Sequence, residues 1–274
     1  SAHAACNFKT SDYLTELSDI SSANYIEVKH KNYRKWNKNA LRIISSPGRI
    51  NSKNKKNFKA MITIHYPFGV CKYSAKVRQS GDNKDHIKFI NGKLAQSLDV
   101  ELKEGNIASV VRFKLFIKET RNSENEIFGT MLLSKLGYLA PRTRNISVTI
   151  NNINLDMLLQ EKASKEFLEY NNRREGPLFE GDESIFYEPG KGFAPIVLEN
   201  ISLSKMINQN WAEKGDKFAK ISLTAFEKLQ AAYIEYTDKI RSGEHSDYRS
   251  SNVSINFPSD NLNSKSKFSD YEIF

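Results

Sequence analysis

The sequence is poor in cysteine and lacks any long apolar run. Two of its 274 residues are cysteines, Cys6 and Cys71, and neither belongs to a C-x-x-C motif or a Cys/His cluster. This arrangement argues against a structural zinc site. Two cysteines can form one disulfide in an oxidising compartment or can both stay reduced, and the sequence leaves both states open. Because no run reaches the roughly eighteen apolar residues that a membrane helix needs, we expect no membrane span in this chain.

The sequence also lacks the short motifs of common nucleotide-binding and hydrolytic enzymes. Its glycines at Gly176, Gly181, Gly190 and Gly192 match neither a Walker loop nor the dinucleotide fingerprint. No G-x-S-x-G elbow is present, so a hydrolase of that type has no support. What is present, 39% apolar and 11% aromatic residues, is typical of a folded globular protein.

Acidic residues are scarce in one part of the chain. Between Lys29 and Lys88 the acids are Asp82 and Asp85, whereas basic residues crowd there, and the whole chain carries a formal net charge of +9. Such a surface can bind an acidic protein, an anionic polymer, lipid headgroups or nucleotide phosphates, although a solvated lysine-rich surface is the simpler interpretation. Because aromatic residues do not interleave with the basic ones as on a stacking platform, nucleic acid is not expected as a partner.

Hydrophobic periodicity predicts a strand-rich chain that ends in helices. Period-2 alternation predicts strands over residues 25–30, 58–64, 70–78, 97–103, 110–117, 146–150 and 153–160. Helical spacing predicts helices over residues 32–44, 125–136, 163–170, 201–210 and 217–240, with a short one after Ser11-Asp12. We expect residues 1–24 to be a polar lead-in, 25–198 a β-rich lobe with two helices, 199–241 a helical part, and 242–274 a polar tail that continues into a further C-terminal segment.

The stretch from Pro141 to Tyr170 is predicted to form strand, turn, strand and helix. Asn151-Asn152 is a turn pair that tolerates positive φ, as a two-residue hairpin requires. The charged pair Glu161-Lys162 follows the second strand and precedes the helix. A carboxylate in that place is a candidate functional group. The simpler interpretation is a surface pair with Lys162, or a charge favoured by the helix dipole.

Several short motifs follow one another in an order that resembles a known family. They are R-x-x-G-D-x-x-D-H from Arg78 to His86, F-K-L from Phe113 to Leu115, Thr120-Arg121, Pro141-Arg142, Glu161, and Arg174-Glu175-Gly176. In order and spacing this series resembles the spore-coat-protein-H (CotH) kinase-like family, in particular its envelope-associated bacterial branch. The resemblance covers about residues 25–183, and the series as a whole carries it, because no single motif is specific.

The resemblance implies an atypical protein kinase. Its fold would be α+β, with an antiparallel β-rich N-terminal lobe packed on a mainly helical C-terminal part. ATP and Mg²⁺ or Mn²⁺ would be the cofactors, and a secreted or surface protein would receive the phosphoryl group, at the cell envelope or outside the cell. Phosphoryl transfer needs a cation at the phosphates and a carboxylate that orients it.

The resemblance also suggests roles for individual residues. Glu161 would be the catalytic carboxylate, a strand lysine such as Lys103 or Lys114 the phosphate-binding cation, and Arg78 or Arg121 would assist. Each has a simpler alternative. Lys114 alternates with Phe113 and Leu115 and can face solvent, and Arg78 can pair with Asp82 to fix the end of its strand. His86, without a partner motif, is more readily structural than catalytic.

Two departures from the family pattern lead to an alternative function. The family's basic strand corresponds to Ser97–Lys103, where Asp99 and Glu101 occupy two basic places. The family's metal-binding aspartates are expected beyond this sequence, so the kinase site would be incomplete here and its metal ligands unknown. Asp182 and Glu183 can hold a metal, but loop acids are usually solvated. The alternative is a non-catalytic envelope or scaffold module whose basic face holds an acidic polymer or protein partner.

Overall fold

A computed structural model describes residues 5–8, 19–90, 92–181, 187–188, 192–193 and 204–242. The chain divides into two compact units. The first comprises Ser1–Leu132 and Pro141–Arg173, and the second comprises Leu133–Ala140 and Arg174–Phe274. Each unit is described by itself.

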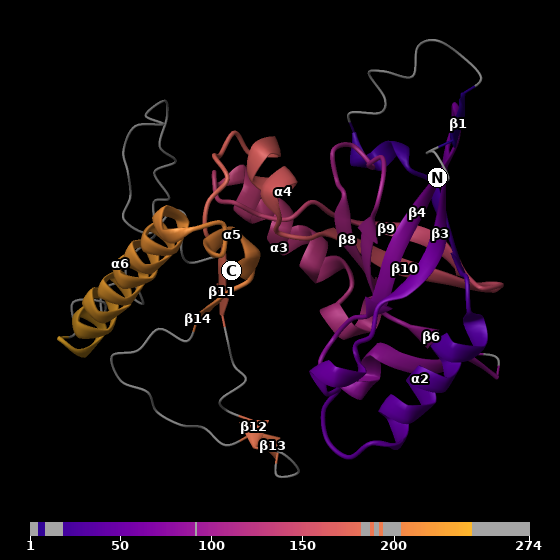
Figure 1. The fold of residues 1–274 in the computed structure, drawn as a ribbon, viewed down its shortest axis with the longest axis horizontal. Coiled ribbons are helices and arrows are strands. Elements are labelled where there is room, and N and C mark those ends of the chain that lie inside the picture. Colours follow the sequence, from indigo (N-terminus) through magenta and orange to yellow (C-terminus); the bar gives the residue numbers. More distant parts are fainter. Residues whose placement is uncertain are drawn as a thin grey trace. The chain divides into compact units, whose positions relative to one another are not determined.

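A closed seven-stranded β-barrel dominates the first unit (Figure 1). The unit contains β1 (Ala5–Phe8), β2 (Tyr25–His30), β3 (Phe58–Tyr66), β4 (Gly69–Gln79), β5 (Ile87–Ile90), β6 (Lys93–Gln96), β7 (Leu98–Leu102), β8 (Arg112–Ile117), β9 (Thr143–Ile150) and β10 (Ile153–Glu161). Around the barrel the order is β4, β3, β2, β9, β10, β8 and β7, and the β7–β4 pairing closes the circle. The β2–β9 pair is parallel, and the other pairs of the barrel are antiparallel. Closure leaves none of these seven strands as a free sheet edge.

Alternation along each strand places one set of side chains inside the barrel. In β4 the residues Cys71, Tyr73, Ala75 and Val77 are buried while their neighbours are more exposed. The facing strands contribute further Ile, Val, Leu, Phe and Met side chains, which form one continuous core. This period of two is the pattern that the sequence shows, and the strands predicted from it are confirmed.

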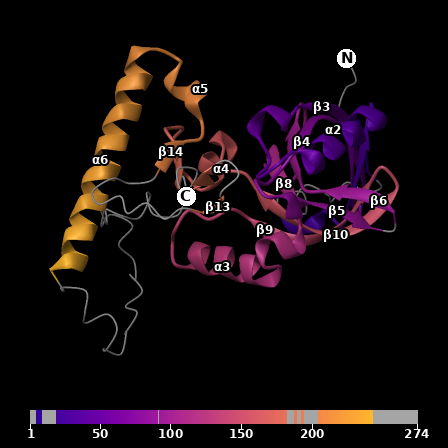
Figure 2. The ribbon, with the colours of Figure 1, turned by 90° about the horizontal axis from the view of Figure 1, so that it is seen from below.

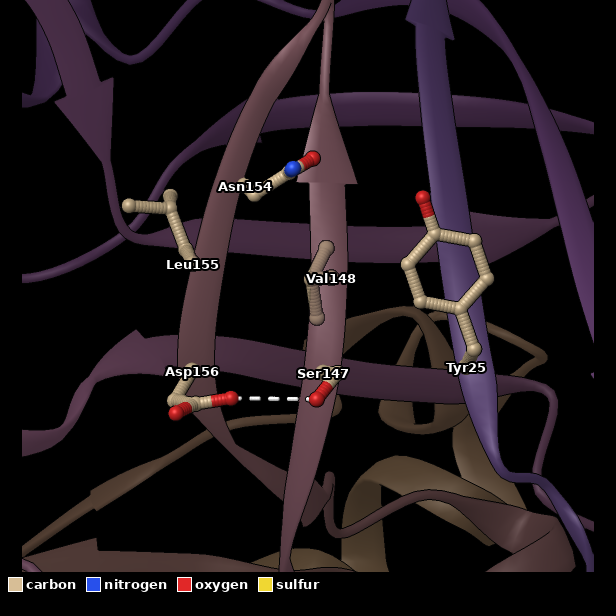
Figure 3. A pocket seen from close by; sticks show the side chains of 6 residues that line it. All are labelled: Tyr25, Ser147, Val148, Asn154, Leu155 and Asp156. Atoms are coloured by element: carbon tan, nitrogen blue, oxygen red, sulfur yellow. Dashed lines mark hydrogen bonds between the residues drawn. The ribbon is translucent and has the colours of Figure 1, made fainter.

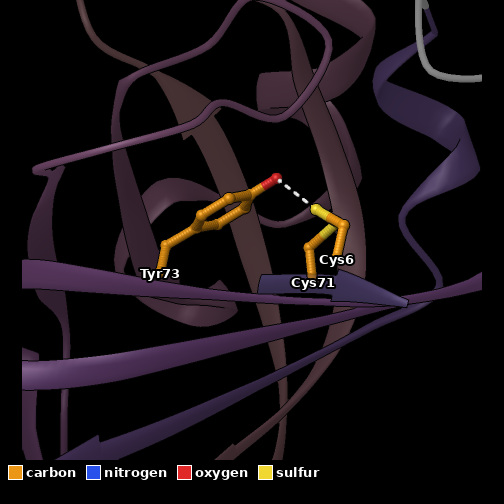
Figure 4. The surroundings of a disulfide bond; sticks show 3 residues. All are labelled: Cys6, Cys71 and Tyr73. Atoms are coloured by element: carbon orange, nitrogen blue, oxygen red, sulfur yellow. Dashed lines mark hydrogen bonds between the residues drawn. A yellow bond between two sulfur atoms is a disulfide. The ribbon is translucent and has the colours of Figure 1, made fainter. Parts of the chain in front are cut away.

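The N-terminal strand β1 completes the seam beside β4. On the side of β4 that faces away from β3, β7 pairs with Ala75–Gln79 and β1 pairs with Gly69–Lys72. Cys6 lies opposite Cys71 in this ladder, and a disulfide joins them beside the hydroxyl of Tyr73 (Figure 4). The strands approach so closely that a Cβ on Gly69 would clash with the carbonyl of Asn7.

Helix α2 (Tyr33–Ser45) lies across one end of the barrel, beside β6 (Figure 1). The side chain of Asn32 caps its first turn by accepting a hydrogen bond from the backbone N–H of Lys35. Trp36 enters the barrel core, and its ring stacks on that of His30 with the centroids 4.2 Å apart. The other apolar side chains of helix α2 pack on the β5–β6 hairpin.

His30, which stacks on Trp36 of α2, makes the free energy of unfolding depend on pH. Burial lowers the pKa of His30 from 6.5 to about 4. Between these values the unfolded chain binds a proton that the folded chain excludes, so stability falls as pH falls from 6.5 to 4, by roughly 3 kcal/mol in total. Urea denaturation at several pH values should show this slope in the wild type and a shallower one in His30→Phe, which keeps an aromatic ring on Trp36. An equal slope in both proteins would contradict the assignment.

The second unit is mainly helical in the part that the structure describes. It contains α5 (Gln209–Ala212), α6 (Asp216–Arg241), and the short strands β11 (Phe179–Gly181), β12 (Tyr187–Glu188), β13 (Gly192–Phe193) and β14 (Ser204–Met206). Trp211 of α5 meets the ring of Phe218 on α6 edge-on. Figure 2 shows α6 as one long helix. No helix among the described residues is both long enough and apolar enough to cross a membrane.

The fold differs from the kinase-like one that the resemblance implies. The α+β prediction of a bilobal, kinase-like protein is wrong, because the antiparallel strands do not form an open lobe but close into a barrel, within a mixed α/β chain whose last described element is a helix. Helix α3 (Glu124–Lys135), α4 (Lys165–Tyr170), α2 and α6 are confirmed. The helix predicted over residues 201–210 is wrong in its described part, where β14 and the start of α5 occur. The helix after Ser11-Asp12 and the tail beyond residue 242 lie outside the described residues.

Candidate functional site: a basic face on the barrel

The outward side chains of β4, β7 and β8 form two cross-strand rows of charges. The strand register sets Arg78, Asp99 and Lys114 side by side in the first row. It sets Lys76, Glu101 and Arg112 side by side in the second. Each row therefore has an acid on the central strand and a cation on either side. We call these two rows, together with Lys103 and Lys162, the basic face.

Asp99 holds the first row together. Its Oδ2 atom accepts hydrogen bonds from Arg78 Nε (2.9 Å) and Nη2 (2.6 Å) and from Lys162 Nζ (3.0 Å). The residue is only 8% exposed. Burial by itself would raise the pKa of Asp99, but the charges of Lys162 and Arg78 outweigh it and hold the pKa below the ordinary value. Asp99 is thus an ionised anchor that fixes two cations in place.

Glu101 takes the corresponding place in the second row. It forms an ion pair with Lys103, and Arg112 and Lys76 lie near enough to act on it electrostatically. Burial would raise the pKa of Glu101, but the hydrogen bond from Lys103 and the neighbouring cations lower it overall. The basic face as a whole sets six cations against two carboxylates. A positive excess therefore remains after both carboxylates are neutralised.

An aromatic ring next to the first row contacts Lys114 of that row and one further cation, Arg121. Phe116 is almost fully buried, with Lys114 Nζ 5.4 Å and Arg121 Cζ 5.2 Å from its ring centroid. Both distances suit cation–π attraction. Arg121 also donates to Glu126 at 2.9 Å.

His86 lies on the same ring but has a structural environment. Its centroid is 5.7 Å from that of Phe116, and its Nδ1 is 2.9 Å from Ser97 Oγ. Burial is the main cause that lowers the pKa of His86. Gly81, at φ +88°, lets the backbone approach the imidazole ring of His86, with which a Cβ at this position would clash. The side chain is buried and bonded, as the simpler interpretation expected.

Glu161 lies on the inner side of the barrel wall, away from the basic face. It continues the inward series of Met157 and Leu159, and its side chain is 2% exposed. Both carboxylate oxygens accept from Arg142, Oε2 from Nε and Oε1 from Nη2, each at 2.8 Å. Burial would lower the pKa of Arg142, but its bonds to Glu161 raise it above the ordinary value.

The other contacts of Arg142 close this end of the barrel. Its Nη1 donates to the carbonyl of Ala108 at 2.7 Å, and its guanidinium stacks on the ring of Tyr170 with 3.6 Å to the centroid. Ala108 and Ser109 both have positive φ, at 49° and 70°, in a tight turn bridged by its flanking residues. Two consecutive non-glycine residues in this region carry backbone strain. The hydrogen bond from Arg142 to the carbonyl of Ala108 stabilises this turn and so offsets its backbone strain.

The residues predicted from the sequence separate into two groups in the structure. Arg78, Lys103 and Lys114 share the basic face, and Arg121 lies at its border over Phe116. Glu161 is not among them. Its oxygens are held by Arg142, so it does not orient a strand lysine in this structure.

Two expected pairings are wrong. Lys162 points to the opposite side of its strand from Glu161 and pairs with Asp99. Arg78 also pairs with Asp99 and not with Asp82, which binds Lys55.

Sequence reasoning missed several members of the basic face. The sequence prediction does not include Lys76 or Arg112, considers Lys162 only as a partner of Glu161, and treats the two acids only as a loss of basic charge. The alternation of Lys76 and Arg78 with buried residues is visible in the sequence. That they lie beside Asp99 and Glu101 depends on strand register, which the sequence does not display.

A metal site is not evident in the described part of the chain. No three His, Cys, Asp or Glu side chains gather there closely enough to hold an ion. Asp182 and Glu183 lie outside the described residues. Comparison of the sequence with protein-family models and with curated proteins finds no match. The resemblance to the CotH family, with its ATP and metal cofactors, therefore stays a prediction.

Proposed function

We propose that the barrel is a non-catalytic binding module that holds an anionic polymer on its basic face. The observation that carries this proposal is the pair of charge rows, in which six cations surround two carboxylates and three of them, Arg78, Lys162 and Lys103, form ion pairs with these carboxylates. The carboxylates pre-order these three cations, because an arginine or lysine already held by a neighbour loses little side-chain freedom when a ligand binds. The remaining positive charge attracts a polyanion.

The spacing of the cations favours a polymer over a small anion. Strands in a sheet lie about 4.8 Å apart, so Arg78 and Lys114, which flank Asp99, are about 10 Å apart at the backbone. The two rows are about 6.6 Å apart along the strands. A single phosphate does not span this grid, whereas a chain with repeated sulfate or carboxylate groups does.

Phosphoryl transfer is less well supported than binding. The kinase proposal assumed a bilobal fold, and the barrel replaces it. It also required Glu161 to orient a phosphate-binding cation. In the structure both carboxylate oxygens of Glu161 accept hydrogen bonds from Arg142 on the inner side of the barrel wall.

Charge reversal on the second row should abolish polymer binding. We expect Lys76→Glu/Arg112→Glu to weaken binding of fluorescein-labelled heparin or polygalacturonate at least 100-fold in fluorescence anisotropy, because two attractive contacts become repulsive. Both residues are exposed, so the fold should be retained. For a polyanion as densely charged as DNA that contacts about four cations, wild-type affinity should fall roughly 100-fold between 50 and 200 mM NaCl.

A matched variant separates this site from the general positive charge of the chain. Lys217→Glu/Lys220→Glu makes the same change in charge on α6, at two exposed lysines outside the basic face. It should bind as the wild type does, within about threefold. Equal losses in the two double variants, or a salt-independent affinity, would refute a specific basic face.

A further inference from the structure

A hollow lies on another sector of the barrel, over β2, β9 and β10 (Figure 3). It has a volume of about 380 Å³, at the lower end of the range for small-ligand sites. Tyr25, Ser147, Asn154 and Asp156 line it with polar or aromatic groups. The strands β9 and β10 form its floor, because Val148 and Leu155 turn their side chains to the barrel core. We call this hollow the tyrosine groove.

Strand register again explains which side chains meet. Tyr25, Ser147 and Asp156 are direct cross-strand neighbours, and Glu27, Thr149 and Asn154 form the next row. Ser147 Oγ donates to Asp156 Oδ1 at 3.0 Å, and Thr149 Oγ1 donates to Asn154 Oδ1 at 2.6 Å. These bonds fix the orientation of the carboxylate and of the amide.

Tyr25 is held as a rigid platform beside these groups. Its hydroxyl hydrogen-bonds with Thr149 Oγ1, and its ring packs against that of His65 with the centroids 5.1 Å apart. Figure 3 shows the ring standing beside β9, opposite Asn154 and Asp156. An aromatic ring fixed by its hydroxyl and by a neighbouring ring offers apolar contact at little cost in conformational entropy.

The groove keeps hydrogen-bonding capacity for a ligand. Within the described residues, the second carboxylate oxygen of Asp156 and the amide N–H₂ of Asn154 have no protein partner. An ionised carboxylate is an acceptor only, and the amide nitrogen is a donor only. The groove therefore presents a strong acceptor, two donors and an aromatic ring within one small hollow.

We propose that the tyrosine groove binds an uncharged saccharide. A sugar has hydroxyl groups that donate to a carboxylate and accept from an amide, and C–H-rich ring faces that pack on an aromatic side chain. The negative charge of Asp156 disfavours an anion such as the polymer proposed for the basic face. One carboxylate and one amide supply too few oxygens for a calcium site, which takes six to eight. This inference does not depend on the basic face.

Titration with neutral oligosaccharides tests the proposal. We would add maltohexaose, cellohexaose and chitohexaose in turn, to millimolar concentration, to the ¹⁵N-labelled full chain and record amide chemical shifts. At least one should shift the amides of β2, β9 and β10. In Tyr25→Ala that affinity should fall at least tenfold through loss of the ring. In Asp156→Asn it should fall about tenfold, because a hydrogen bond to a charged acceptor is lost.

Two further variants keep the test decisive. Tyr25→Phe retains the ring and should bind within about threefold of wild type, and the Lys76→Glu/Arg112→Glu variant should bind saccharide normally even though polyanion binding is lost. If Tyr25→Ala fails to fold, the exposed Asp156→Asn substitution carries the test. Absence of shifts in the groove with all three sugars would overturn the proposal. So would binding that survives both Tyr25→Ala and Asp156→Asn.

Discussion

Replacing Arg142 with methionine should destabilise the barrel by about 3–5 kcal/mol. The substitution removes both hydrogen bonds to Glu161 and leaves a carboxylate whose side chain is 2% exposed without its charge partner. It also removes the donor to the strained Ala108 carbonyl and the stacking on Tyr170. Urea denaturation at pH 7, with the midpoint and slope compared with those of the wild type, measures the loss.

The double variant Arg142→Met/Glu161→Leu is the control for this result. Removing both charges together should recover most of the lost stability, because an uncompensated buried charge costs more than the pair contributes. A loss below about 1 kcal/mol in Arg142→Met would mean that water or another residue solvates Glu161. An additive loss in the double variant would show that the two residues do not act as a pair.

Reducing the Cys6–Cys71 disulfide should cost about 4 kcal/mol in the chain-entropy model, because the bond closes a loop with a sequence separation of 65. Reduction also frees β1 to leave the edge of β4 between Gly69 and Lys72. The measurement is thermal or urea unfolding with and without a phosphine reductant. Cys6→Ala/Cys71→Ala should match the reduced wild type and should not respond to the reductant.

A small effect of reduction would have a definite meaning. If stability changed by less than about 1 kcal/mol, the unfolded chain would already be compact around this loop, since the entropic gain depends on freedom in the unfolded state. Substitution of Phe8 by alanine in the oxidised protein separates the covalent contribution from packing, because Phe8 contacts Phe68 with the ring centroids 5.6 Å apart. We expect that variant to lose clearly less stability than reduction does.

Local structure was predictable where one physical signal dominated. The alternation through β3 and β4 reflects one buried face, and Asn151-Asn152 takes the positive φ that its turn requires. The prediction of a helix over residues 201–210 is wrong because Ser204–Met206 pairs with β11, and this pairing decides its conformation. Short segments of this kind are governed by tertiary contacts more than by their own periodicity.

The charged sites were only half predictable, for a related reason. Glu161 has the same strand parity as Met157 and Leu159, so its inward direction was legible in the sequence once the strand was assigned. Its partner, Arg142, lies before β9, and the pairing depends on the β9–β10 register. The basic residues were visible as a composition, but their grouping around Asp99 arises only when β4, β7 and β8 become neighbours.

The parallel pairing of β2 with β9 has a consequence for how the protein is made. Tyr25 and Ser147 meet across about 120 residues of sequence, so this contact carries a large loop-closure entropy and belongs among the slow steps of folding. During synthesis the β3–β4 hairpin can form early, while the other edge of β2 stays open until β9 and β10 have left the ribosome. Between the synthesis of β2 and that of β9, about 120 residues later, the nascent chain therefore exposes an unpaired edge of β2, a strand with one apolar face. A chaperone or rapid completion of the hairpin Thr143–Glu161 would protect it from aggregation.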